Sequence, residues 1–144
     1  MTLEEAFINK KMEDIERYLT ELKDLLKFSN KLILSDNLKI HAQERIFQLI
    51  VDSITSINQH IIKELELSKE PEDPQTAFYI LAEKQILPEK FAFKVAPVVA
   101  VRNRIVHEYE SLDQDLFAKN LRENYTDFEK YLKYIEEYLN KKSA

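Results

Sequence analysis

The chain has 144 residues, 44% of them apolar, with no Cys, no Gly and a formal charge of −5. This length and apolar content suit one folded domain, while the lack of Gly excludes Gly-rich phosphate-binding loops and the lack of Cys excludes disulfides, thiolate metal sites and cysteine nucleophiles. The negative charge argues against holding nucleic acid by bulk electrostatics and leaves only a local cationic site open. No stretch of about 18 uncharged apolar residues occurs, so we expect no signal peptide, no membrane span and a cytoplasmic protein.

Two long amphipathic helices are predicted in the first half of the chain. A capping box that begins at Thr2 precedes apolar residues at alternating steps of four and three, which predicts a helix over 3–29. Ser35 or Asp36 is expected to cap a second helix over 37–67. The apolar stripes are Ile8, Met12, Ile15, Leu19, Leu22 and Leu26 in the first helix, and Ile46, Ile50, Ile54, Ile57, Ile61 and Leu65 in the second.

A polar loop and short helices are predicted next. Residues 68–75 contain two Pro among charged residues, which predicts a solvated loop. Thr76 is expected to cap a helix that ends near Gln85. Pro88 suits the first turn of another short helix, because proline is tolerated there.

The last third of the chain contains an interrupted helix and a long one. Pro97 either kinks a helix or takes the first position of a new one that ends near Tyr109. The last helix is expected to start at Ser111 or Asp113, with an apolar face formed by Phe117, Leu121, Tyr125, Phe128, Leu132, Ile135 and Leu139. No strand is predicted, so we expect an all-α, up-and-down bundle of long antiparallel helices with one or two short helices.

The histidines do not indicate a metal centre. Carboxylate-bridged metal sites in helical bundles use Glu-x-x-His pairs, and none of His41, His60 and His107 has a Glu three residues before it. His41 and His60 are far apart on the second helix, so we interpret each as structural or exposed. No metal and no cofactor is expected.

A group of polar residues lies within residues 98–109. Val and Ile residues straddle Arg102 on the predicted helix, so a guanidinium lies in an apolar stripe and needs an anionic partner. Tyr109 lies seven residues further along the same line. Asn103 and His107 are four residues apart, where the amide can orient the imidazole.

Two interpretations fit these residues. In the structural one, Arg102 makes a salt bridge within the bundle or across a dimer contact, and His107 interacts with the helix dipole. In the functional one, Arg102 holds a phosphate and His107 transfers a proton, as in metal-free cleavage of a phosphodiester beside a ribose 2′-hydroxyl. Arg104 would then supply a further phosphate contact.

The pattern Arg102-x4-His107-x-Tyr109, with Asn103 after the arginine, resembles the signature of the HEPN superfamily, specifically the HepT-like ribonuclease toxins of HEPN/MNT toxin–antitoxin pairs. The resemblance implies one HEPN-like helical domain over residues 1–144 that forms a homodimer, with two motifs in one cleft. It also covers parts of the long second helix and the start of the last one, at Glu44, Arg45, Asp52, residues 58–62, Leu112 and Asp113.

The resemblance also implies a function. Arg102 and His107 would be the catalytic residues of a metal-independent endoribonuclease toxin, with RNA and not DNA as the substrate. An MNT-type nucleotidyltransferase antitoxin, similar to MntA, would silence the toxin by adding AMP to Tyr109. Two alternatives stay open: a non-catalytic HEPN module that binds a nucleotide or the nucleotidyltransferase, and a purely structural helical dimer.

Overall fold

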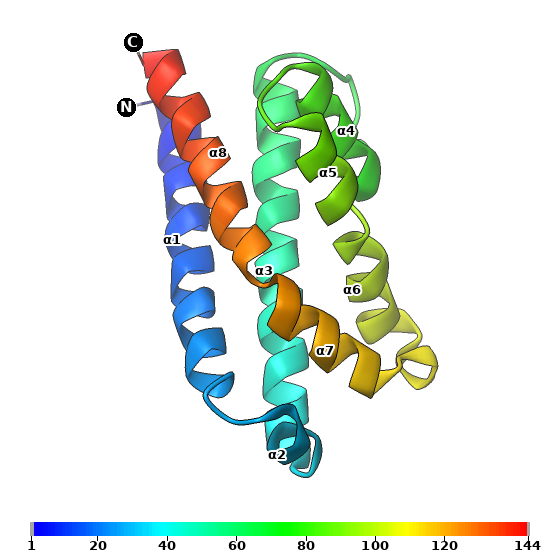
Figure 1. Ribbon diagram of the computed structural model, residues 1–144. Helices are drawn as coiled ribbons and strands as arrows, with labels where there is room; N and C mark the ends of the chain where they lie inside the picture. The colour runs from blue at the N-terminus through cyan, green and yellow to red at the C-terminus, as the bar shows by residue number, and fades with distance from the viewer. Residues whose placement is uncertain (1, 144) are drawn as a thin grey trace.

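The computed structural model describes residues 2–143, and every regular element within them is helical. Four antiparallel segments form an up-and-down bundle, as Figure 1 shows: α1 runs down, α3 returns, α5 and α6 run down again, and α7 with α8 return, while α4 runs up beside α3 and packs antiparallel against α5. The expected all-α bundle is therefore confirmed. The helices are α1 (Leu3–Leu25), α2 (Asn30–Leu34), α3 (Asn37–Glu64), α4 (Pro74–Glu83), α5 (Glu89–Val95), α6 (Val98–His107), the 3₁₀ turn η1 (Tyr109–Ser111), α7 (Gln114–Asn124) and α8 (Thr126–Ser143).

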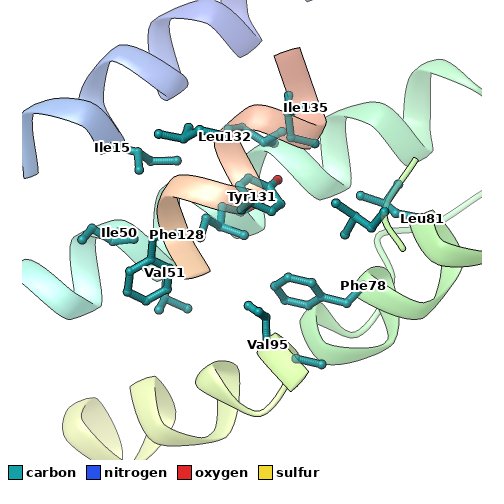
Figure 2. Close-up of a cluster of buried hydrophobic side chains, with 14 of the residues drawn as sticks. Ile15, Ile50, Val51, Phe78, Leu81, Val95, Phe128, Tyr131, Leu132 and Ile135 are labelled. Atoms are coloured by element: carbon teal, nitrogen blue, oxygen red, sulfur yellow. Dashed lines mark hydrogen bonds between the residues drawn. The ribbon is translucent and has the colours of Figure 1, made fainter. Parts of the chain in front are cut away.

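Helix α3 is the centre of the bundle, in contact with α1 on one side and with α4 and α6 on the other. Side chains from α1, α4, α5 and α8 meet those of α3 in a closely packed apolar core (Figure 2). Such burial is the main force that holds the helices together. The labelled members of this core are Ile15, Ile50, Val51, Phe78, Leu81, Val95, Phe128, Tyr131, Leu132 and Ile135. No helix within residues 2–143 is both long enough and apolar enough to cross a membrane.

Tyr131 of α8 is the largest fully buried side chain in this core. Its hydroxyl donates a hydrogen bond to Oδ1 of Asn58 on α3 over 2.6 Å. Burial raises the pKa of Tyr131 well above its ordinary value, so the hydroxyl stays protonated and able to donate. Because an unpaired buried polar group costs about 1–3 kcal/mol, this bond fixes the position of α8 against α3.

Several helix ends differ from the sequence-based expectation. The capping box of Thr2 is confirmed, but the first helix ends at Leu25 instead of residue 29. Ser29 then caps α2, a five-residue helix that the periodicity did not predict. Asp36 caps α3 as expected, whereas Asp73, and not Thr76, caps α4. Two backbone N–H groups donate to the Asp73 carboxylate, and the following proline occupies the first helical position.

The last helix is divided in two. Asp113 caps α7 as expected, but α7 ends at Asn124 and α8 begins at Thr126. Arg122 ties α7 to the link between α1 and α2 through bonds to the carbonyls of Leu26 and Phe28. Helix α8 lies along α1 (Figure 1), so the two parts of this segment follow different neighbours.

Two helices end in left-handed residues that are not glycine. Glu66 follows α3 with φ 53° and Gln85 follows α4 with φ 60°. At the end of α4, the N–H of Ile86 donates to the carbonyl of Leu81 and the N–H of Gln85 donates to that of Ala82. This pair of bonds is the Schellman motif, in which the left-handed position is ordinarily glycine. Because the chain has no Gly, the backbone carries steric strain at the C-terminal ends of α3 and α4.

We predict that Gln85→Gly raises the free energy of unfolding by about 0.5–1 kcal/mol, because relief of the left-handed strain exceeds the added entropy of the unfolded chain. The matched control is Lys84→Gly, where the backbone has φ −87° and no strain is relieved. This control is expected to lower stability by a similar amount. Urea unfolding measures both, and a loss of stability in Gln85→Gly would contradict the assignment of strain.

Candidate active site

Helix α6 carries the residues of the sequence motif. It starts after Pro97, which separates it from α5. Of the two expectations for this proline, the start of a new helix is the one observed, with Pro97 as the N-cap and not the first helical residue. The helix starts at Val98 and ends at His107, two residues before the expected end. It packs against α3 and α4, and Val99 is its only buried residue, which leaves its outer side open to solvent.

Arg102 points from α6 toward α3. Its Nε donates to Oδ1 of Asp52 over 2.7 Å, which supplies the anionic partner that the apolar surroundings require. Its Nη1 donates to Oδ1 of Asn103 over 3.2 Å. The Arg102 side chain is 25% exposed, so the guanidinium is anchored at one edge and still reaches the surface. Since an arginine has five N–H donors, this arrangement can bind an anion while the salt bridge is kept.

His107 is the last residue of α6 and is exposed. Five residues along an α-helix correspond to a rise of about 7.5 Å and a rotation of about 140°, so its ring leaves the helix on a different side from Arg102. The imidazole lies at the C-terminal end of α6, beside solvent. It is therefore placed to exchange protons with a ligand that reaches α6 from solvent.

Tyr109 lies beyond the helix, in the η1 turn, because the backbone leaves the helical conformation at Glu108. The expected continuous line from Arg102 to Tyr109 is therefore wrong. The Tyr109 hydroxyl donates to Oε1 of Glu44 over 2.7 Å and accepts from Nε2 of Gln114 over 2.8 Å. Burial and the bond to Glu44 raise the pKa of Tyr109 above its ordinary value of 10.

The two remaining motif residues point in different directions. Asn103 is exposed, and its amide oxygen is turned toward Arg102. Arg104 lies on the other side of α6 and lines a cavity of about 450 Å³ between α6 and α7, together with Val101 and Leu116. The structure thus brings Asn103 to Arg102 and separates Arg104 from both.

The two histidines of α3 lie away from this site. His41 is exposed, and His60 is half-buried and stacks on the ring of Phe7 with centroids 4.4 Å apart. Both placements agree with the interpretation of these residues as structural or exposed. Within residues 2–143, no group of three His, Cys, Asp or Glu side chains is arranged to hold a metal ion.

Two acidic partners of the site were not identified as such from the sequence. Asp52 and Glu44, both on α3, hold Arg102 and Tyr109 respectively. The spacing of apolar residues could have identified Glu44 as buried, because it lies four residues after Ile40 and three before Phe47, both of which are buried. A carboxylate in such a row needs a hydrogen-bond donor from another helix.

Comparison with known proteins identifies the family. The family model described as "Ribonuclease HepT-like" matches residues 15–135. The chain is 34% identical over 141 residues to the tRNA nuclease HepT of Aphanizomenon flos-aquae, covering 95% of this chain and 92% of that protein. It is 24% identical over 110 residues to the mRNA nuclease HepT of Shewanella oneidensis, covering 76% and 78% of the two chains.

Solved structures share the fold. One is described as the tri-AMPylated Shewanella oneidensis HEPN toxin in complex with MNT antitoxin, with a TM-score of 0.83 and 20% identity over 94% of this chain and 98% of that one. The Bacillus subtilis cytosolic protein of unknown function YutE matches with a TM-score of 0.68 and 19% identity over 90% and 91% of the two chains. The family model and the 34% identical relative show that this chain belongs to the ribonuclease HepT-like family.

Proposed function

We propose that this protein is a metal-independent endoribonuclease toxin in which Arg102 and His107 are the catalytic residues. The observation that carries the proposal is the arrangement on α6 of a guanidinium anchored to Asp52 and an exposed imidazole. A fixed cation and an imidazole that can transfer a proton are two components that catalyse phosphodiester cleavage. The names of the two HepT relatives support RNA as the substrate, and RNA as the substrate supports action in the cytoplasm.

The proposed reaction is an attack by the ribose on its own phosphate. His107 in its neutral form takes the proton of the 2′-hydroxyl while the 2′-oxygen bonds to phosphorus. The bond to the 5′-oxygen breaks and that oxygen takes up a proton, which yields a 2′,3′-cyclic phosphate and a 5′-hydroxyl end. Arg102 stabilises the additional negative charge on the phosphate oxygens through N–H groups other than the one given to Asp52.

The open side of α6 supports a homodimer in which two motifs face one cleft. Ala100, Asn103, Val106 and His107 are all exposed there, and Val106 is among the more exposed large apolar residues of the chain. A second copy on this side would cover Val106 and bring two further motif cations to the RNA. Arg104, on the cavity side, would contact a more distant phosphate of the same strand.

The proposed regulation is the addition of AMP to Tyr109 by an MNT-type nucleotidyltransferase antitoxin, and it is supported by the description of the Shewanella complex. Tyr109 is 37% exposed in the turn after His107, within reach of a second protein. The adduct adds bulk and a negative phosphate beside the motif. It would block RNA by sterics and by charge.

We predict that His107→Ala abolishes cleavage of RNA by the purified protein in EDTA. The wild-type protein is expected to produce cyclic-phosphate 3′ ends, because no metal takes part in the step. His41→Ala, which removes an exposed histidine of α3, is the matched control and should cleave like the wild type. Cleavage that survives in His107→Ala would remove its role, and no cleavage by AMP-free dimer over a panel of RNAs would favour a non-catalytic binding module.

We predict that Arg102→Lys lowers the cleavage rate about 100-fold. A lysine has one ammonium group, and Asp52 would hold it, so the planar array of donors for the phosphate is lost. The same conservative change in Arg17→Lys, on the exposed surface of α1, should leave the rate unchanged. The measurement is the initial rate of RNA cleavage at saturating RNA for the wild type and both variants. A wild-type rate in Arg102→Lys would rule out bidentate recognition of the phosphate.

We predict that the chain gains the mass of one or more AMP groups when it is co-expressed with its partner nucleotidyltransferase. The added mass should be absent in Tyr109→Phe, which lacks the acceptor oxygen. Intact-mass spectrometry of both proteins makes this comparison. An unmodified wild-type chain, or equal modification of Tyr109→Phe, would contradict Tyr109 as the acceptor.

A further inference from the structure

The Tyr109 hydroxyl is held between two side chains from different helices. Glu44 of α3 accepts its proton in a hydrogen bond of 2.7 Å, and Gln114 of α7 donates to the oxygen over 2.8 Å. The Glu44 side chain is almost completely buried, and its second oxygen, Oε2, is enclosed without a hydrogen-bond partner among the described residues. Burial of a carboxylate costs free energy, and the one hydrogen bond to Tyr109 leaves the second Glu44 oxygen unpaired.

A phenol is a poor nucleophile until it loses its proton. Burial and the neighbouring carboxylate raise the pKa of Tyr109, so the free phenolate is rarer at neutral pH than for an ordinary tyrosine. Transfer of AMP to this oxygen therefore needs a base in contact with the hydroxyl as the new bond forms. Glu44 already occupies that position.

We propose that Glu44 is the general base for the AMPylation of Tyr109, so that the toxin chain itself supplies a catalytic residue for its own modification. This inference rests on the proposed function, in which Tyr109 receives AMP from ATP. As the Tyr109 oxygen bonds to the α-phosphorus, its proton passes to Oε1 of Glu44. The bond between the α-phosphorus and the bridging oxygen breaks, pyrophosphate leaves with that electron pair, and Glu44 afterwards returns the proton to water.

The neighbouring groups fit this assignment. Asp52, two turns further along α3, is bonded to Arg102 and not to the phenol. Glu108 and Glu110, which flank Tyr109 in the chain, are both exposed. The N–H of Gln114 points at the phenolic oxygen, so it stabilises the negative charge that develops there as the proton leaves. Base and charge-stabilising donor are thus both in contact with the reacting oxygen.

The test is Glu44→Gln, which keeps the shape and the hydrogen-bond acceptor but cannot take a proton. With the partner nucleotidyltransferase and ATP, we expect the initial rate of AMP addition to fall about 100-fold or more. Glu110→Gln, which removes a charge from the same turn without touching the phenol, is the matched control and should stay within twofold of the wild type.

A second readout separates a base from a structural support. The rate of AMP addition to the wild type, divided by the rate for Glu44→Gln, should fall toward one as the pH rises from about 7 to 9.5. At high pH, hydroxide removes the phenol proton without the help of Glu44. The same comparison can be made without the partner protein. The measured quantity is then the rate at which 5′-(4-fluorosulfonylbenzoyl)adenosine labels Tyr109 in each chain. If Glu44→Gln does not fold, Glu44→Asp, which withdraws the carboxylate but keeps its charge, should slow both reactions at least tenfold.

The outcomes distinguish this inference from the proposed function. AMP addition to the wild type together with an equal rate in Glu44→Gln would overturn the role of Glu44 and leave Tyr109 as the acceptor. A ratio that does not change with pH would also overturn it, since a merely structural role predicts that result. A wild-type chain that takes no AMP would overturn the regulatory part of the proposed function and this inference with it.

Discussion

The pairing of buried polar groups on α3 is the constraint on which the rest of the structure depends. This helix is enclosed by its neighbours, yet it carries Glu44, Asp52 and Asn58 within or beside its buried face. An unpaired buried group such as Glu44 or Asn58 costs about 1–3 kcal/mol, so each must find a donor from another element. Asp52, by contrast, is 40% exposed and pairs with Arg102 at the edge of this face. Tyr109, Arg102 and Tyr131 supply those donors, from η1, α6 and α8 respectively. One helix therefore fixes both the closure of the bundle and the position of the candidate site.

The long helices were predictable because their apolar residues recur with the period of a helix over many turns. The stripe in α1 is buried as expected from Ile8 to Leu22, but Leu26 lies beyond the helix and is only partly buried. In α3 the buried row passes through Phe47 and Val51, while Ile46 is only partly buried and Leu65 is exposed. Helix α2 has five residues, too few for a period to be visible. The division at Tyr125 was not predictable either, because neither Pro nor Gly marks it in the sequence.

The candidate site was predictable in its residues and not in its geometry. A permanent charge within an apolar stripe identified Arg102 and required an anionic partner, but that partner is 50 residues away in the sequence and only the packing of α6 on α3 identifies it as Asp52. The expected line from Arg102 to Tyr109 failed because the helix ends between them, at His107. The prolines at 88 and 97 divide this part of the chain into short helices, so α6 can pack on α3 at its own angle (Figure 1).

The contribution of α8 to the core has a consequence for biosynthesis. Tyr131, Ile135 and Leu139 fill the space beside α3, and they are translated after the whole of α6. At a synthesis rate of about 5–20 residues per second, the interval between His107 and Leu139 is roughly 2–6 s. During that interval the motif exists in a chain whose central helix lacks its cover, with Asn58 still unpaired. A nascent chain that stalls before α8 therefore lacks the side chains that complete the apolar core beside α3.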